Sequence, residues 1–281
     1  FFSCVGHNLY LRKQKKMYYK YDLKNGIIYE WKQFLLPFFV TLVACFSFTS
    51  DIRTAENIGQ IDRGIMLSDV IIYLFKGEQP FDPMNPESFR FPFLWLIIQL
   101  GLAFITGKYP LSEIYTNHGA NVLIKGRSRT KWILSKFLWI FTVCIVYYLI
   151  IFLTIITYSK ILNYNINLNL VETNSLILLA PIKNISITNL ICIYLLPVTT
   201  SITISFLQFT IAVLFNSVIS FAFTLVMCGV SIFYENIYLI GNCSLLIRNE
   251  IYNIDGISIK MSYFILLVVI VISFTFSIVY F

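Results

Sequence analysis

The segment from Trp132 to Tyr158 reads WILSKFLWIFTVCIVYYLIIFLTIITY and contains a single charged residue, Lys136. An apolar run of about 20 residues is long enough, as a helix, to cross the roughly 30 Å hydrocarbon layer of a membrane. The run is continuously apolar rather than alternating, which favours a helix over a strand of a membrane barrel. We therefore expect a membrane-spanning helix here, with Lys136 close enough to one end to extend its amine to the lipid headgroups.

Five further runs of this kind occur along the chain. They are Trp31 to Ser50, Phe91 to Gly107, Ile187 to Leu214, Val218 to Tyr234 and Met261 to Tyr280. The composition agrees, since 58% of the 281 residues are hydrophobic and only 12% are charged, whereas about a quarter of the residues are charged in a soluble domain. We expect an all-α integral membrane protein with six transmembrane helices, forming a single domain over residues 1–281.

The basic residues lie mainly on one side of these six runs. With the N-terminus inside, the inner segments hold 13 of the 21 Lys and Arg residues and 3 of the 14 Asp and Glu residues. Cytoplasmic segments of membrane proteins carry an excess of Lys and Arg. We therefore expect a multi-pass protein of the plasma membrane with both termini in the cytoplasm. The excess of Lys and Arg in the inner segments accounts for the net charge of +7. We therefore expect no nucleic-acid partner.

Residues 1–30 have the pattern of a cytoplasmic amphipathic helix that lies along the inner membrane surface. One sector of this helix is apolar and contains Tyr10, Leu11, Met17, Tyr18, Tyr21 and Ile28. The neighbouring sector is basic and contains Lys13, Lys16, Lys20 and Lys24. Each basic residue gains about 1 kcal/mol beside anionic lipid, so we expect membrane lipids as partners. The alternative is a solvated basic tail with no partner.

The chain starts at Phe1 rather than Met, so we expect its natural start to lie further upstream. The pattern of a cleavable signal peptide is absent from this region. The dipeptide Asn25-Gly26 offers a bend before the first apolar run.

Residues 108–131 form the inner loop between the second and third runs and read KYPLSEIYTNHGANVLIKGRSRTK. An apolar stripe at helical spacing contains Leu111, Ile114, Tyr115, His118 and Val122. A stripe of this kind on a cytoplasmic helix needs a surface to dock on. The basic residues that follow it are typical headgroup anchors, namely Lys125, Arg127, Arg129 and Lys131. The alternative is an ordinary basic loop, which explains the charges but not the stripe.

Residues 51–90 form an acidic outer loop. It contains an apolar patch from Ile65 to Phe75 that is interrupted by Asp69. The patch is too short to cross the bilayer, so we expect it to lie on the outer surface or to dip into it. Pro80, Pro83 and Pro86 then exclude a regular helix.

The fourth run carries polar residues without charge. On a helix, Ser201, Ser205 and Gln208 share one side, which predicts a translocation path, while Thr210 lies on the opposite side, which predicts packing on a neighbouring helix. The alternative is that these hydroxyls bond to their own backbone carbonyls next to the kink at Pro197.

The chain has no recognisable catalytic or metal-binding motif. Its six cysteines are scattered singly and are typical of small apolar core residues, and its two histidines are far apart. A phosphate-binding loop is absent from the sequence, so we expect no nucleotide hydrolysis, no metal and no cofactor bound by this chain. An intramembrane enzyme is disfavoured for the same reason.

The segments GANVLIKGRSRTKWILSKFLW, from Gly119 to Trp139, and LFKGEQPF, from Leu74 to Phe81, resemble ABC type-2 exporter permeases of Gram-positive bacteria. The branch that they resemble is associated with bacteriocin or peptide export and immunity. The resemblance implies an ABC type-2 exporter-like fold in which residues 108–131 carry a coupling helix. That helix would dock on a cytoplasmic ATPase subunit, which uses ATP and Mg²⁺. The short link around Asn216 departs from the family and leaves little room for a second docking element.

The resulting expectation is the permease subunit of an ATP-driven exporter, paired with a second copy of itself or with a sister permease. Its substrate would be amphipathic or apolar, such as a peptide, bacteriocin, lipid or drug, because the runs present aromatics and hydroxyls rather than fixed charges. The alternative is a membrane-embedded immunity protein that sequesters a toxin without ATP.

Overall fold

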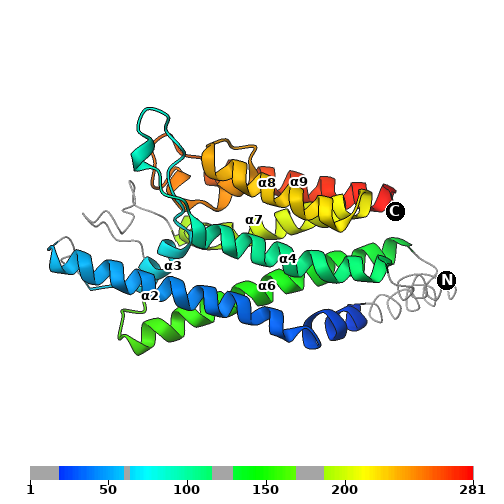
Figure 1. The fold of residues 1–281 in the computed structure, drawn as a ribbon, viewed down its shortest axis with the longest axis horizontal. Coiled ribbons are helices and arrows are strands. Elements are labelled where there is room, and N and C mark those ends of the chain that lie inside the picture. Colours follow the sequence, from blue (N-terminus) through cyan, green and yellow to red (C-terminus); the bar gives the residue numbers. More distant parts are fainter. Residues whose placement is uncertain (1–18, 60–63, 116–128, 169–186, 281) are drawn as a thin grey trace.

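The computed structural model describes residues 19–59, 64–115, 129–168 and 187–280, and within these ranges the protein is built from helices without β-strands beyond isolated bridges. Six of the helices run along the long axis of the molecule (Figure 1). They are α2 (Leu35–Asn57), α4 (Phe93–Tyr115), α6 (Arg129–Ile161), α7 (Ile187–Leu214), α8 (Ser217–Phe233) and α9 (Ile259–Tyr280). Each contains most of one of the six predicted apolar runs.

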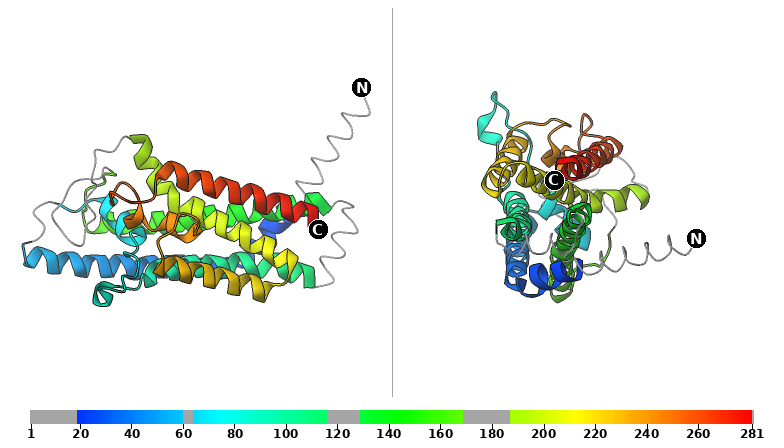
Figure 2. Two further views of the ribbon diagram at one scale, coloured as in Figure 1. Left: turned by 90° about the horizontal axis from the view of Figure 1, so that it is seen from above. Right: turned by 90° about the vertical axis from the view of Figure 1, so that its right-hand side faces the viewer.

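Helix α7 is the centre of this arrangement, because it contacts α4, α6, α8 and α9. Helix α2 packs on α6 and α4 along the other side of the bundle (Figure 1). We call the end of the bundle where residues 19 and 280 lie the terminal end. The α7–α8 link, the C-terminal end of α4 and the start of α6 lie there as well (Figure 2).

Among the described residues, four helices are long and apolar enough to cross a membrane, which indicates a membrane protein. Their bounds by this measure are Trp31–Asn57, Arg129–Ile161, Thr188–Leu214 and Ile259–Tyr280. Two more segments, Phe93–Lys108 and Ser217–Phe233, are apolar but shorter. The all-helical, membrane-protein part of the expected fold class is therefore confirmed.

Helices α2 and α4 continue farthest past the predicted ends of their apolar runs. Helix α2 extends beyond Ser50 to Asn57, and α4 extends beyond Gly107 to Tyr115. A helix can continue after the side chains become polar, since its backbone hydrogen bonds are made within the helix itself. At 1.5 Å per residue, the part of α4 after Lys108 adds about 10 Å to its length.

The predicted apolar patch from Ile65 to Phe75 forms the short helix α3 (Leu67–Phe75) at the end opposite the terminal end. Eight of its nine residues are buried, and it packs against α2, α4 and α6. Asp69 lies within this buried helix, where its carboxylate accepts a hydrogen bond of 2.9 Å from the N–H of Met66. The patch therefore packs inside the bundle, and its position relative to the membrane surface stays a prediction.

The segment before α2 packs on α6, a contact that the sequence pattern does not predict, while its placement on the membrane surface stays a prediction. Residues 19–23 are helical, η1 (Lys24–Ile28) is a π-helical turn, and η2 (Trp31–Phe34) is a 3₁₀ turn. Gly26 lies so close to Trp139 that a Cβ atom at Gly26 would come 2.5 Å from the indole nitrogen. Of the predicted apolar sector, Tyr21 and Ile28 are 40% and 64% exposed. The face of this segment that is buried against α6 contains Asp22 and Gly26 instead.

Replacing Gly26 by alanine should lower the unfolding temperature of the protein in detergent. The new methyl group would overpack against Trp139, which costs about 1–3 kcal/mol. Gly229→Ala in α8 is the matched control, because nothing lies within 4 Å of a Cβ atom there and alanine is roughly 1 kcal/mol better than glycine inside a helix. Equal shifts for the two variants would contradict the packing of Gly26 on α6.

Candidate functional site

The residues predicted to dock a partner, and those predicted to anchor the chain at the inner surface, lie at the terminal end where the structure describes them. Leu111, Ile114 and Tyr115 belong to the last turns of α4. Arg129 and Lys131 occupy the first turn of α6, and Lys20 and Lys24 are exposed on the segment before α2. The remaining predicted residues lie outside the described ranges, namely Lys13, Lys16, His118, Val122, Lys125 and Arg127.

A buried ion pair links the segment before α2 to α6 at this end. Asp22 Oδ1 lies 2.6 Å from Lys136 Nζ, and Asp22 Oδ2 accepts a hydrogen bond of 2.5 Å from Ser135 Oγ. The residues Asp22 and Lys136 are 2% and 1% exposed. The ammonium group also lies 5.3 Å from the centre of the Trp132 ring, in a cation–π contact.

This pair corrects the expectation that Lys136 extends to the lipid headgroups. A charge inside an apolar bundle is retained only where it is paired and hydrogen-bonded, and Asp22 supplies that partner at a separation of 114 residues in sequence. Sequence reasoning placed Asp22 in a basic amphipathic segment and assigned it no role. The available signal was that an acidic residue of the N-terminal segment could pair with Lys136, the one charged residue of the run from Trp132 to Tyr158.

The three predicted path residues of α7 are buried between helices. Ser201 Oγ donates to Gln99 Oε1 at 2.8 Å and is 2.6 Å from Tyr148 Oη, so it joins α7 to α4 and α6. Ser205 Oγ accepts from Cys144 Sγ at 3.7 Å. Gln208 Nε2 donates to the carbonyl oxygen of Ala103 at 3.0 Å. Of the three, Gln208 lines a groove between α4 and α8. The role of these residues in a path stays a prediction.

The opposite side of α7 packs on α9 through hydroxyl groups, as the sequence predicted. Thr210 Oγ1 lies 3.0 Å from Ser277 Oγ and donates to the carbonyl oxygen of Ser273 at 3.1 Å. It also bonds back to the carbonyl of Phe206 at 2.9 Å. Packing between helices and bonding to the helix's own backbone therefore occur together at this residue.

At the other end of the bundle, a buried arginine caps helix α8. Arg248 is 0% exposed, and its guanidinium group donates to the carbonyl oxygens of Ser231 at 2.5 Å, Ile232 at 2.7 Å and Tyr234 at 3.3 Å. These carbonyls end α8 and have no partner within the helix, and a positive charge there also interacts favourably with the helix dipole. Burial lowers the pKa of Arg248 to about 10, so the group remains charged at neutral pH.

The same side chain ties two other segments to α8. Its Nε donates to the carbonyl oxygen of Glu78 at 3.2 Å, and its Nη1 donates to Asn242 Oδ1 at 2.5 Å. Next to it, the N–H of Ile247 donates to the carbonyl oxygen of Lys76 at 2.8 Å. Sequence reasoning did not identify Arg248, because nothing in its neighbours distinguishes a buried arginine from one on a loop surface.

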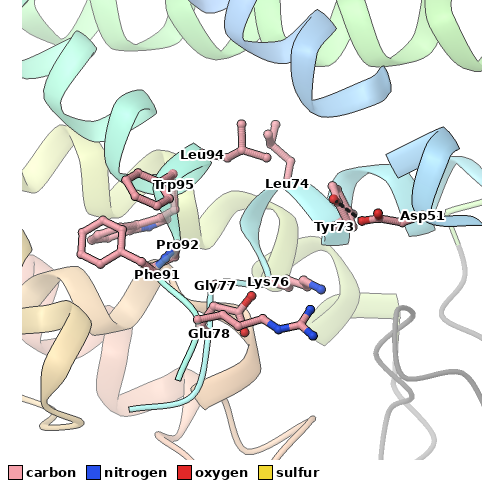
Figure 3. Close-up of a pocket in the computed structure, with 12 residues that line it drawn as sticks. Asp51, Tyr73, Leu74, Lys76, Gly77, Glu78, Phe91, Pro92, Leu94 and Trp95 are labelled. Atoms are coloured by element: carbon pink, nitrogen blue, oxygen red, sulfur yellow. Dashed lines mark hydrogen bonds between the residues drawn. The ribbon is translucent and has the colours of Figure 1, made fainter. Parts of the chain in front are cut away.

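A cleft of about 200 Å³ opens beside this cap (Figure 3). Phe91, Pro92 and Trp95 lie on one side of it, and Tyr73 lies on the other, where its hydroxyl donates to Asp51 Oδ2 at 2.7 Å. The charged residues Lys76, Glu78 and Arg90 also line the cleft. Burial raises the pKa of Glu78 above its ordinary value, and the nearby Lys76 and Arg90 oppose that shift.

Within the described ranges, no group of three or more His, Cys, Asp or Glu residues is placed to hold a metal ion. No family model, no curated protein and no solved structure matches the chain. The inferences about function therefore rest on the residues themselves.

Breaking the buried ion pair should destabilise the protein strongly. Lys136→Met leaves the Asp22 carboxylate buried without its ammonium partner, which costs about 3–5 kcal/mol. The double variant Asp22→Leu, Lys136→Met should lose less, because no buried charge is left over. Denaturation in detergent measures both values.

Lys108→Met, which breaks an exposed ion pair, is the matched control for Lys136→Met. Lys108 Nζ lies 2.9 Å from Glu30 Oε2, but the two side chains are 50% and 37% exposed, so the loss should be within about 1 kcal/mol. A single Lys136→Met variant that is as stable as this control would contradict the burial of the pair.

Glu78→Gln should stabilise the protein at neutral pH and not in acid. A raised pKa means that the ionised carboxylate is disfavoured in the folded state relative to the unfolded chain, so its contribution to stability falls as pH rises through the folded-state pKa. Well below the ordinary value of 4.5 the carboxyl group is neutral in both states and the glutamine should have no such effect. Unfolding temperatures across pH test this, with the exposed Glu87→Gln at the same end as control.

Proposed function

We propose that this chain is the permease subunit of an ATP-driven exporter of the plasma membrane. In this proposal all six long helices span the bilayer, in an arrangement like that of ABC type-2 exporters, and the terminal end faces the cytoplasm. The excess of Lys and Arg in the segments at that end supports the orientation. The ATP and Mg²⁺ are used by a cytoplasmic ATPase subunit, and a second copy of the chain or a sister permease completes the path.

The observation that carries the proposal is the continuity of two long helices at the terminal end. Helix α4 continues unbroken from the bundle through Tyr115, and α6 starts again at Arg129. The predicted docking stripe, Leu111 to Val122, begins on the last turns of α4 and lies between these two helices in sequence. A partner that grips the stripe would therefore push directly on the ends of two long helices.

The buried pair of Asp22 and Lys136 extends this connection to the segment before α2. Because the pair is desolvated, separating the segment from α6 would leave charges unpaired in an apolar environment. A displacement of α6 would thus carry the N-terminal segment with it. An ATPase partner can drive such a displacement only by binding the two arrangements of the permease with different affinity.

The charge distribution of the long helices supports an amphipathic or apolar substrate. In the part of the chain that the structure describes, the charged residues of α2, α4, α6 and α9 lie near helix ends, except for the paired Lys136, and α7 and α8 carry none. A substrate that crossed this bundle would meet aromatic rings and hydroxyl groups rather than fixed charges. Peptides, bacteriocins, lipids and drugs with an apolar face fit that environment.

Co-purification with the ATPase encoded beside this chain tests the proposal. The wild-type permease should bring the ATPase with it, and Ile114→Asp with Tyr115→Asp should abolish the complex because charge disrupts an apolar docking surface. The matched control is Ile254→Asp with Tyr238→Asp, which places the same changes on residues that are 83% and 80% exposed at the other end. Absence of any ATPase from the wild-type preparation would contradict the proposal.

A second readout separates export from toxin sequestration. If the chain exports a toxin, its protection of cells against that toxin should disappear when the nucleotide site of the ATPase is inactivated. Protection that persists without nucleotide hydrolysis would favour an immunity protein that binds the toxin.

A further inference from the structure

A groove of about 520 Å³ runs between α4 and α8 near the terminal end. Its apolar lining comes from both helices, with Phe104 on α4 and Val218, Phe221, Leu225 and Val226 on α8. These two helices lie side by side along the bundle (Figure 1). The groove is open toward the surroundings of the bundle, since Phe104 and Val218 are 58% and 75% exposed.

Small residues create the depth of this groove. Ala103, Gly107 and Ala222 line it, and they leave room that larger side chains would fill. A Cβ atom on Gly107 would come 2.7 Å from Gln208 Nε2, so glycine at this position allows the amide of α7 to reach the floor of the groove. The amide of Gln208 therefore lies next to Gly107, the residue that precedes Lys108 on α4.

The amide of Gln208 presents an acceptor that the described part of the chain leaves unmatched. The side chain is 2% exposed, its Nε2 donates to the carbonyl oxygen of Ala103, and its Oε1 has no hydrogen-bond partner there. Exchanging the two amide atoms would set Oε1 against the carbonyl oxygen of Ala103, so the network supports the orientation described. Most buried acceptors in proteins have a donor. The oxygen is covered in this structure, so a ligand's donor reaches it by displacing the side chains over it.

The mouth of the groove favours a phosphate. Lys108 lines it, held by Glu30 at 2.9 and 3.2 Å, which uses at most two of its three N–H donors. Helix α8 begins at Ser217 beside it, where Asn216 Oδ1 accepts from the N–H of Ile219. The earlier N–H groups of this first turn have no acceptor within the helix, and with the helix dipole they attract an anion.

We propose that the α4–α8 groove binds a membrane phospholipid whose headgroup carries a hydrogen-bond donor. An acyl chain lies along the apolar lining, the phosphate lies between Lys108 and the first turn of α8, and a headgroup hydroxyl or ammonium donates to Gln208 Oε1. The rim carries both signs of charge, Lys108 and Glu30, which suits an ethanolamine headgroup, and a glycerol headgroup supplies the same donor as a hydroxyl. This site goes beyond the proposed transport function and requires only that the bundle is embedded in a membrane.

Native mass spectrometry of the purified protein tests the site with three added lipids. Phosphatidylethanolamine and phosphatidylglycerol should each be retained in preference to phosphatidylcholine, whose headgroup has no N–H or O–H donor. Gln208→Met should lower the retention of the first two lipids by roughly three- to tenfold, toward that of phosphatidylcholine. Equal retention of all three lipids by the wild-type protein would overturn the proposal.

A variant that fills the groove gives a test independent of Gln208. Ala222→Trp should abolish retention, and since Ala222 is exposed the change should leave the unfolding temperature in lipid-free detergent unchanged. Val230→Trp is the matched control, because Val230 lies on the same helix, is 38% exposed and is outside the groove. Unchanged lipid retention in Ala222→Trp would overturn the site. A loss of dimers in that variant with unchanged lipid retention would instead assign the groove to a second copy of the chain.

Discussion

A polar group inside an apolar bundle has no water to bond to, and this constraint shapes the whole molecule. Hydroxyl groups along the long helices bond to carbonyls one turn back, as Thr154 and Thr200 do. In α7, the hydroxyl of Tyr148 donates to the carbonyl oxygen of Pro197 and also hydrogen-bonds to the hydroxyl of Ser201. The hydroxyl of Ser201 in turn donates to Gln99 Oε1. The polar residues thus hold α4, α6 and α7 in one register, while the apolar residues around them supply most of the packing.

The helices themselves could be predicted from the sequence because continuous apolar runs of about 20 residues have few other stable structures. All six runs are helical, and the hydroxyl contacts of Thr210 with α9 follow from its place on the helix. The ends were harder to predict. The apolar pattern stops at Ser50 and Gly107, but the helices continue to Asn57 and Tyr115, since the backbone can remain helical after the side chains become polar.

Contacts between distant segments could not be predicted from patterns at all. The pairing of Asp22 with Lys136 depends on a π-helical turn, Lys24–Ile28, and on the close approach of Gly26 to Trp139. Helical periodicity assigns residues to faces but says nothing about which face a tertiary contact will bury. For the same reason, the pattern does not predict that an aspartate lies at the buried face of this segment. The burial of α3 and of Arg248 likewise depends on which segments meet at the far end.

The capping of α8 by Arg248 has a consequence for the order in which the protein can be assembled. Synthesis proceeds from the N-terminus, so the segment around Glu78 emerges long before Arg248, which follows it by 170 residues. Until that arginine arrives, the carbonyls of Ser231 and Ile232 and the segment around Glu78 lack their shared donor. The far end of the bundle must therefore close late during biogenesis, once five of the six long helices have been made.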